Sequence, residues 1–127
     1  MKFQPDAPLA GPVITRLEPG RVWVGGVAYD HSLLLPWNGP VQDWGVATPA
    51  DLRAVHFERI AALRPEVVVF GSGARLRFPE PALLRALIDL RIGVETMDTA
   101  AACRTYNVLA SEGRHVLAAL VLGEAAA

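Results

Sequence analysis

The alternation of strand-like and helix-like segments in the second half of the chain constrains the fold most. Residues 67–70 read Val-Val-Val-Phe, and β-prone residues recur at 94–97 and 116–122. A continuous apolar run such as 67–70 is typical of a strand that is buried on both faces. Segments with helical periodicity lie between the three strands, so the order along the chain is strand, helix, strand, helix, strand. This order predicts parallel strands joined by right-handed crossovers.

Three helices are predicted from spacing and capping signals. The first begins at Thr48, a capping residue, followed by Pro49, and continues to Pro65. It carries an apolar stripe formed by Leu52, Val55, Ile60 and Leu63. The second carries an apolar stripe formed by Leu83, Leu84, Leu87 and Ile88, with Arg85 and Asp89 facing out. The third begins at Asp98 or Thr99 and ends near Ser111, before Gly113.

The first third of the chain predicts an antiparallel meander. Residues 13–17, 21–24, 27–29 and 32–35 read as strands, and Pro and Gly in the intervening segments favour tight turns. Residues 36–47 form an irregular connection. We therefore predict an α/β fold that forms one layered domain over residues 1–127. It has a mixed central sheet with helices packed on it and an additional N-terminal antiparallel β layer, expected at the edge of the parallel core.

Composition excludes several classes of function. Twelve basic and thirteen acidic residues nearly cancel, which argues against nucleic acid as a partner. The longest apolar run is much shorter than the ~20 residues of a membrane-spanning helix. Residues 1–6 show no signal core and no transit pattern, and one cysteine fits a reducing compartment, so the sequence predicts a cytoplasmic protein.

Two loops of the predicted sheet form a candidate crevice. Gly71, Ser72 and Gly73 follow one strand, and Thr99 follows the next, so both loops are expected at the carboxyl edge where ligands bind in open α/β sheets. Arg104 and Asn107 lie further along the helix that Thr99 begins. Glycine amides, a helix N-terminus and arginines together suit a small anion. The simpler alternative is that Gly-Ser-Gly only turns the chain, since it matches neither a dinucleotide fingerprint nor a P-loop.

Complete catalytic motifs are absent from the sequence. The three histidines are scattered, so neither a metal site nor a cofactor is predicted. Cys103 lies near the start of the third helix, which would favour a reactive thiol, but a lone cysteine among alanines is usually a small core residue.

Two tryptophans lie in the irregular connection. Trp37 and Trp44 could form a surface for a protein partner, since tryptophan is enriched at binding hot spots. They could equally fix the connection to the body of the domain by packing. The oligomeric state cannot be deduced from the sequence.

Several spaced motifs carry a resemblance to a known family over almost the whole chain. These motifs comprise residues 26–33 (Gly-Val-Ala-Tyr-Asp-His-Ser-Leu), Trp44, residues 69–73, residues 93–99 (Gly-Val-Glu-Thr-Met-Asp-Thr), Ala102, residues 104–109 and residues 112–114. The chain resembles the small domain shared by the mitochondrial respiratory complex I assembly factor 3, the adipogenesis-associated Mth-type domain-containing protein and many uncharacterised bacterial and archaeal proteins. The resemblance implies a mixed sheet with helices and an added β layer. It implies no established reaction.

These observations together favour a non-catalytic protein-interaction or assembly module over an enzyme. The alternative is a small-molecule (anion) binding protein or enzyme that uses the crevice beside Gly71, Ser72 and Gly73 and beside Thr99 and Arg104.

Overall fold

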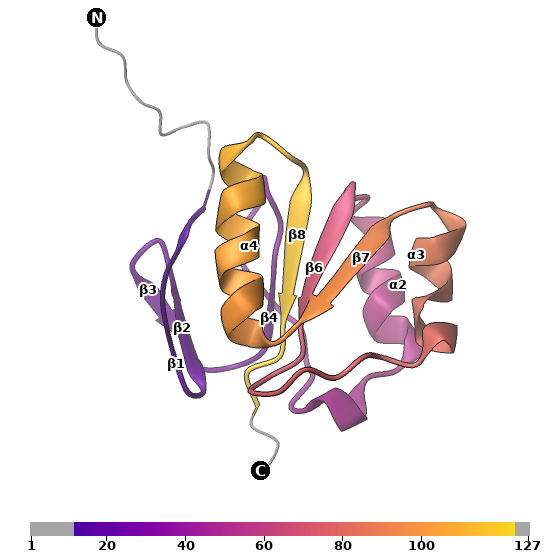
Figure 1. Ribbon diagram of the computed structural model, residues 1–127, viewed down its shortest axis with the longest axis horizontal. Coiled ribbons are helices and arrows are strands. Elements are labelled where there is room, and N and C mark those ends of the chain that lie inside the picture. The colour runs from indigo at the N-terminus through magenta and orange to yellow at the C-terminus, as the bar shows by residue number, and fades with distance from the viewer. Residues whose placement is uncertain (1–11, 124–127) are drawn as a thin grey trace, which may run out of the picture.

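The computed structural model describes residues 12–123, and the amino-terminal stretch behind the cytoplasmic prediction lies outside that range. Five strands form a central sheet in the order β5-β4-β8-β6-β7. Their bounds are β4 Leu33–Leu35, β5 Gln42–Asp43, β6 Val67–Gly71, β7 Gly93–Met97 and β8 Val116–Leu120. A separate antiparallel sheet contains β1 Ile14–Glu18, β2 Arg21–Val24 and β3 Val27–Tyr29. The predicted mixed sheet and additional β layer are therefore confirmed (Figure 1).

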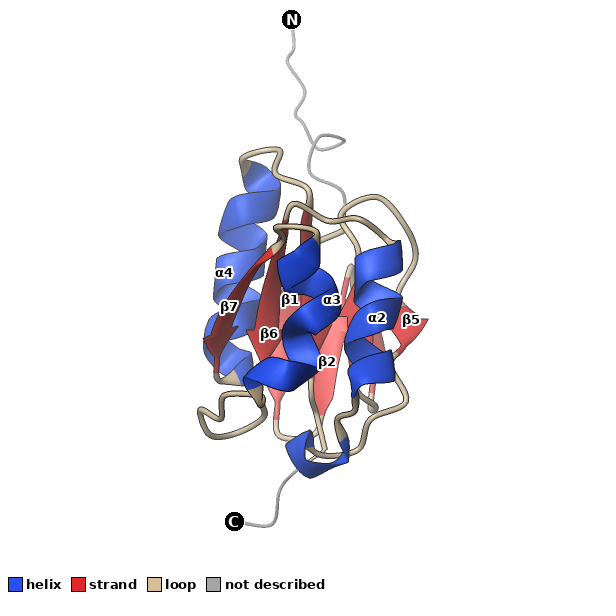
Figure 2. Ribbon diagram, turned by 90° about the vertical axis from the view of Figure 1, so that its right-hand side faces the viewer, coloured by secondary structure: helices blue, strands red, loops and turns tan. Residues whose placement is uncertain are grey.

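The parallel core matches its prediction. Strand β6 pairs in parallel with β7 on one side and with β8 on the other. All five residues of β6 are buried, as the apolar run at 67–70 predicts for a strand covered on both faces. The connection from β6 to β7 passes through α3 (Arg85–Asp89), and that from β7 to β8 passes through α4 (Thr99–Ser111) on the opposite face (Figure 2).

The meander was predicted with one strand too many. Strand β4 leaves it and pairs antiparallel with β8 in the central sheet. The reason is visible in its burial: Leu33, Leu34 and Leu35 are all fully buried, and three consecutive leucines need cover on both faces. The remaining β1–β3 sheet lies beside α4 at the β4 end of the central sheet, and its buried side chains join the hydrophobic cluster under α4 (Figure 1).

The first two predicted helices are shorter than their apolar stripes suggest. A 3₁₀ turn at η1 (Pro49–Asp51) is separated from α2 (Ala54–Ala62), and Val55 in the predicted stripe is 61% exposed. The second begins as a 3₁₀ turn, η2 (Pro81–Leu84), and continues as α3, where Ile88 is also exposed. Proline at positions 79 and 81 delays a regular helix there because it supplies no amide donor.

Helix α4 forms as predicted. The carboxylate of Asp98 caps it by accepting a hydrogen bond from the Ala101 amide at 2.8 Å. Its C-terminal turn is followed by Gly113 in the left-handed region with φ +79°. The central sheet thus separates two hydrophobic clusters, one under α4 and the small sheet and one under α2 and α3.

Candidate functional site

Two glycines at the end of β6 and in the loop after it are needed for different reasons, Gly71 for close packing and Gly73 for its backbone conformation. A side chain at Gly71 would place its Cβ 2.9 Å from both Cα and Oγ1 of Thr99, and 3.0 Å from the Cβ of Ala102. Gly73 has φ +104°, a conformation that side chains disfavour. The N-terminal turn of α4 therefore lies directly against the loop, as the crevice hypothesis requires, but Gly71 leaves no open space there.

Ser72 holds the next part of the loop in shape. Its hydroxyl is 2.6 Å from the Arg75 carbonyl oxygen, to which it donates, and it accepts a hydrogen bond from the Arg77 amide at 2.9 Å. The residue is 2% exposed, and its own amide donates to the Met97 carbonyl. A hydroxyl with these partners stabilises a turn and is not free to act as a nucleophile.

Thr99 and Asn107 also hydrogen-bond to the backbone. The Thr99 hydroxyl accepts from the Gly73 amide at 2.8 Å and donates to the Val121 carbonyl at 2.9 Å. The Asn107 side chain pairs with both polar groups of Ile14: its oxygen accepts from the Ile14 amide at 2.9 Å and its nitrogen donates to the Ile14 carbonyl at 2.8 Å. Asn107 thus joins α4 to the small sheet.

A first cleft, which we call the α4 cleft, lies where the crevice was expected. It encloses about 250 Å³. The β1–β2 turn, the loop after β6, the start of α4 and the end of β8 supply its lining: Leu17, Glu18, Pro19, Gly20, Gly73, Ala74, Asp98, Thr99, Ala100, Val121 and Leu122. Of the predicted crevice residues, Gly73 and Thr99 contribute to it. Arg104 is exposed and is not among the residues that line it, so the expectation that Arg104 faces the crevice is wrong.

The charge of the α4 cleft also differs from the prediction. Its lining contains two carboxylates, Glu18 and Asp98, and the described residues supply no arginine or lysine to it. Asp98 already interacts with the positive end of the α4 dipole. A small anion would therefore meet negative charge in this cleft rather than the predicted cations.

A second cleft, which we call the Phe78 cleft, lies on the other side of the same loop. It encloses about 460 Å³. The segment around η1, the end of β6 and the segment leading into η2 supply its lining: Pro49, Ala50, Leu52, Arg53, Phe70, Arg77, Phe78, Pro79, Glu80 and Leu83. Sequence reasoning missed it because its walls come from segments far apart in the chain.

Two large apolar side chains on this loop face solvent. Leu76 is 53% exposed and Phe78 is 74% exposed, and arginines 75 and 77 alternate with them. The sequence signal was the alternating run Arg-Leu-Arg-Phe between Gly73 and Pro79.

The two tryptophans of the irregular connection have different environments. Trp44 is 1% exposed and packs edge-on against Phe57 and Phe70, with its indole nitrogen donating to the His56 carbonyl. The prediction of Trp44 as part of a partner surface is therefore wrong, and the packing alternative holds. Trp37 is partly exposed and stacks on His115 with ring centroids 4.9 Å apart.

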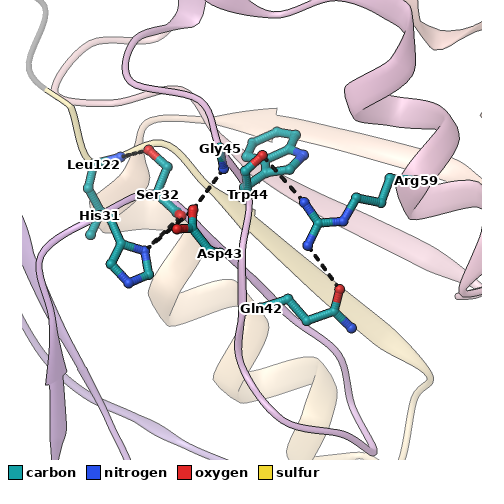
Figure 3. Close-up of polar contacts among 8 residues, drawn as sticks. All are labelled: His31, Ser32, Gln42, Asp43, Trp44, Gly45, Arg59 and Leu122. Carbon is teal, nitrogen blue, oxygen red and sulfur yellow. Dashed lines mark hydrogen bonds and ion pairs between the residues drawn. The ribbon is translucent and has the colours of Figure 1, made fainter.

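A polar cluster around β4 and β5 brings His31, Ser32 and Asp43 close together (Figure 3). The His31 Nδ1 lies 3.8 Å from an Asp43 oxygen, but the Ser32 hydroxyl is buried and accepts a hydrogen bond from the Leu122 amide. Arg59 joins α2 to this edge by donating to the Gln42 side chain and to the Trp44 carbonyl. The cluster fastens the edge of the sheet and does not present a serine nucleophile to solvent.

Cys103 and Tyr106 are buried under α4. Burial raises the pKa of the Cys103 thiol to about 11, so the thiol is protonated at neutral pH and poorly nucleophilic. The Tyr106 hydroxyl is buried without a hydrogen-bond partner, and burial raises the pKa of Tyr106 to about 12. Within residues 12–123, no group of three or more His, Cys, Asp or Glu side chains is arranged to hold a metal ion.

The fold and the clefts define a small mixed α/β domain with an added β layer. The chain belongs to the family described as "Protein of unknown function (DUF498/DUF598)", whose model matches residues 14–121. The described part of the chain contains no helix that is both long and apolar enough to cross a membrane.

Three known proteins illustrate the relationship. The NADH dehydrogenase [ubiquinone] 1 alpha subcomplex assembly factor 3 of Bos taurus is 36% identical over 121 residues, which is 94% of this chain and 65% of the cattle protein. The chain thus spans somewhat less than two thirds of that relative. A crystal structure from Bordetella parapertussis has a TM-score of 0.84 at 39% identity, covering 89% of this chain and 97% of the other. A Mth938-like domain from Bordetella pertussis has a TM-score of 0.83 at 33% identity, and the match covers 98% of this chain and 94% of the other.

Proposed function

We propose that this domain is a non-catalytic protein-interaction or assembly module and that it contacts its partner through residues 74–79, which we call the docking loop. The observation that carries the proposal is the exposure of Leu76 and Phe78 on a loop that Ser72 holds in one shape. A loop backbone that is already held in one shape loses less conformational entropy when a partner covers its apolar side chains. Aromatic side chains of this kind are frequent hot spots of interfaces.

Two further facts support a binding role. Within the described part of the chain, the residues that line the two clefts include no histidine, cysteine or serine. The one hydroxyl among these lining residues, that of Thr99, already donates its proton to the Val121 carbonyl. The cattle relative is named an assembly factor, and an exposed docking loop suits that kind of role.

Affinity capture from the native lysate with quantitative mass spectrometry tests the proposal. Phe78→Ser and Leu76→Ser are compared with the parent and with Ile88→Ser, a matched control because Ile88 on α3 is 55% exposed. We expect a specific partner to be retained by the parent and the control, and to decrease about ten-fold with Phe78→Ser. Equal recovery by all four proteins, or no specific partner of the parent, contradicts the proposal. Circular dichroism checks that each variant is folded.

A further inference from the structure

We infer that the segment bound by the docking loop is acidic: a stretch of a partner protein that inserts an apolar side chain into the Phe78 cleft and places carboxylates beside it. This inference rests on the proposed function and names the chemistry of the partner. The apolar part of the cleft is formed by Leu52, Phe70, Phe78 and Leu83, with Phe78 as a mostly exposed wall. Its volume of about 460 Å³ can receive a large apolar side chain.

Positive charge surrounds this apolar surface. Arg53 and Arg77 both line the cleft, and Arg75 is exposed two residues before Arg77. Glu80 is the carboxylate among the lining residues, and Asp51 lies between Ala50 and Leu52 in η1. The three arginines therefore leave this region with a surplus of one positive charge. Arginine suits this role because its planar guanidinium binds a carboxylate with two parallel hydrogen bonds.

The arginines are held near the cleft. The Arg53 guanidinium donates to the Ala50 carbonyl at 3.4 Å and to the Leu52 carbonyl at 3.2 Å, which keeps it over the η1 segment. The backbone of Arg77 is fixed because its amide donates to the Ser72 hydroxyl. Positions that are set before binding reduce the entropic cost of forming charge pairs with a partner.

The shape of the surface favours a protein over an anionic bilayer. A bilayer surface is nearly flat and would cover the exposed Phe78 but leave the cleft beside it unfilled. A side chain that protrudes from a polypeptide fills the cleft, and the flanking carboxylates then reach the arginines. The α4 cleft has the opposite charge, with Glu18 and Asp98 in its lining, so an acidic segment is directed to the Phe78 cleft alone.

A phage-displayed library of short random peptides, selected on the full chain, tests the inference even while the natural partner is unidentified. We expect the enriched peptides to combine Asp or Glu with an aromatic or aliphatic residue. The affinity of a synthesised, fluorescently labelled enriched peptide is then measured by anisotropy. We expect its Kd to rise about ten-fold in Arg53→Glu and in Arg77→Glu, and to rise with added salt. Arg91→Glu is the control, because exposed Arg91 precedes β7 at the opposite end of the parallel strands.

Several results would overturn the inference. These are the absence of any enriched peptide, enrichment of basic or uncharged peptides, or equal affinity in the parent and the charge-reversed variants. If a charge-reversed variant does not fold, the same measurement is made with the neutral variants Arg53→Gln and Arg77→Gln. Sedimentation of the parent with phosphatidylcholine vesicles that contain phosphatidylserine, lost in Phe78→Ser, would assign the loop to a membrane surface instead.

The two proposals can fail separately. If the partner captured from the lysate is lost with Phe78→Ser but kept with Arg53→Glu and Arg77→Glu, the docking loop stands and the acidic partner is rejected. If Phe78→Ser leaves capture unchanged, the proposed function itself is rejected.

Discussion

Residues 71–73 and residues 75–78 follow one another in the same loop but have opposite surroundings. The first group is buried against α4, and its polar groups hydrogen-bond to neighbouring backbone and to Thr99. The second group is exposed, with an apolar side chain at every second position. The contrast indicates that the glycine-rich motif positions the loop, and that the residues after it are the ones available to a partner.

The largest expected effect is at the buried end of the loop. Gly71→Val should lower the free energy of unfolding by about 3 kcal/mol, because the new side chain would collide with the backbone of Thr99 and the Cβ of Ala102. Denaturant unfolding measures the change. Ala74→Val, at an exposed position three residues later, is the control and should change stability little. A Gly71→Val protein as stable as the parent would show that α4 does not pack against the loop.

Removal of the Ser72 hydroxyl tests the link between the two groups. Ser72→Ala should cost about 2 kcal/mol, since it leaves the Arg77 amide without the acceptor that it has in the turn. It should also weaken partner capture, because the docking loop loses its fixed shape. The exposed Ser111 hydroxyl, which donates to the Val108 carbonyl, provides the matched control Ser111→Ala. Similar losses of stability in both variants would contradict a special role for Ser72.

Substitution of Asn107 tests how α4 is joined to the small sheet. Asn107→Ala should cost about 1 kcal/mol, because both hydrogen bonds to Ile14 are lost at a partly buried position. Amide hydrogen exchange should become faster in β1–β3 while β6 and β8 stay protected. Exposed Asn38→Ala serves as the control. Uniformly faster exchange over the whole chain would show that Asn107 supports the domain generally rather than the β layer.

The smallest expected effect on stability is at the exposed end of the loop. Phe78→Ser should change the free energy of unfolding by less than about 0.5 kcal/mol, since its side chain is 74% exposed. The same variant should lose the partner. A large loss of stability would instead mean that Phe78 supports the Phe78 cleft, and the binding comparison would then need the Arg53 and Arg77 variants.

The sequence predicts the parallel core because the relevant signal is local. The run at 67–70 and the capped helix beginning at Thr99 each specify an element from its own residues. The placement of residues 32–35 could not be read in this way. Three consecutive leucines indicate a strand that is covered on both faces, but they do not specify which strand lies beside it, and pairing with β8 is a property of the folded sheet.

Local sequence signals also predicted only part of the candidate site. Sequence reasoning placed the loops after β6 and β7 next to each other, and the contact between Gly71 and Thr99 confirms that placement. It could not tell that Arg104 lies outside the lining of the α4 cleft or that Trp44 is buried, since the surroundings of a side chain depend on what packs around the helix or connection. The Phe78 cleft needed residues 49–53 and 77–83 to be brought together, and no local pattern encodes that contact.

From the sequence alone came the resemblance to the family, the parallel strands implied by alternating elements, and the glycine-containing turn beside α4. The order of those strands in the sheet was not among these predictions. The predicted features follow from the conformational preferences of residues and from hydrophobic periodicity, which are properties of short segments. Tertiary structure decided which polar groups are already hydrogen-bonded, which apolar groups stay exposed and where charge collects. Those properties depend on distances between segments that are remote in the chain, so they are set only when these segments pack together.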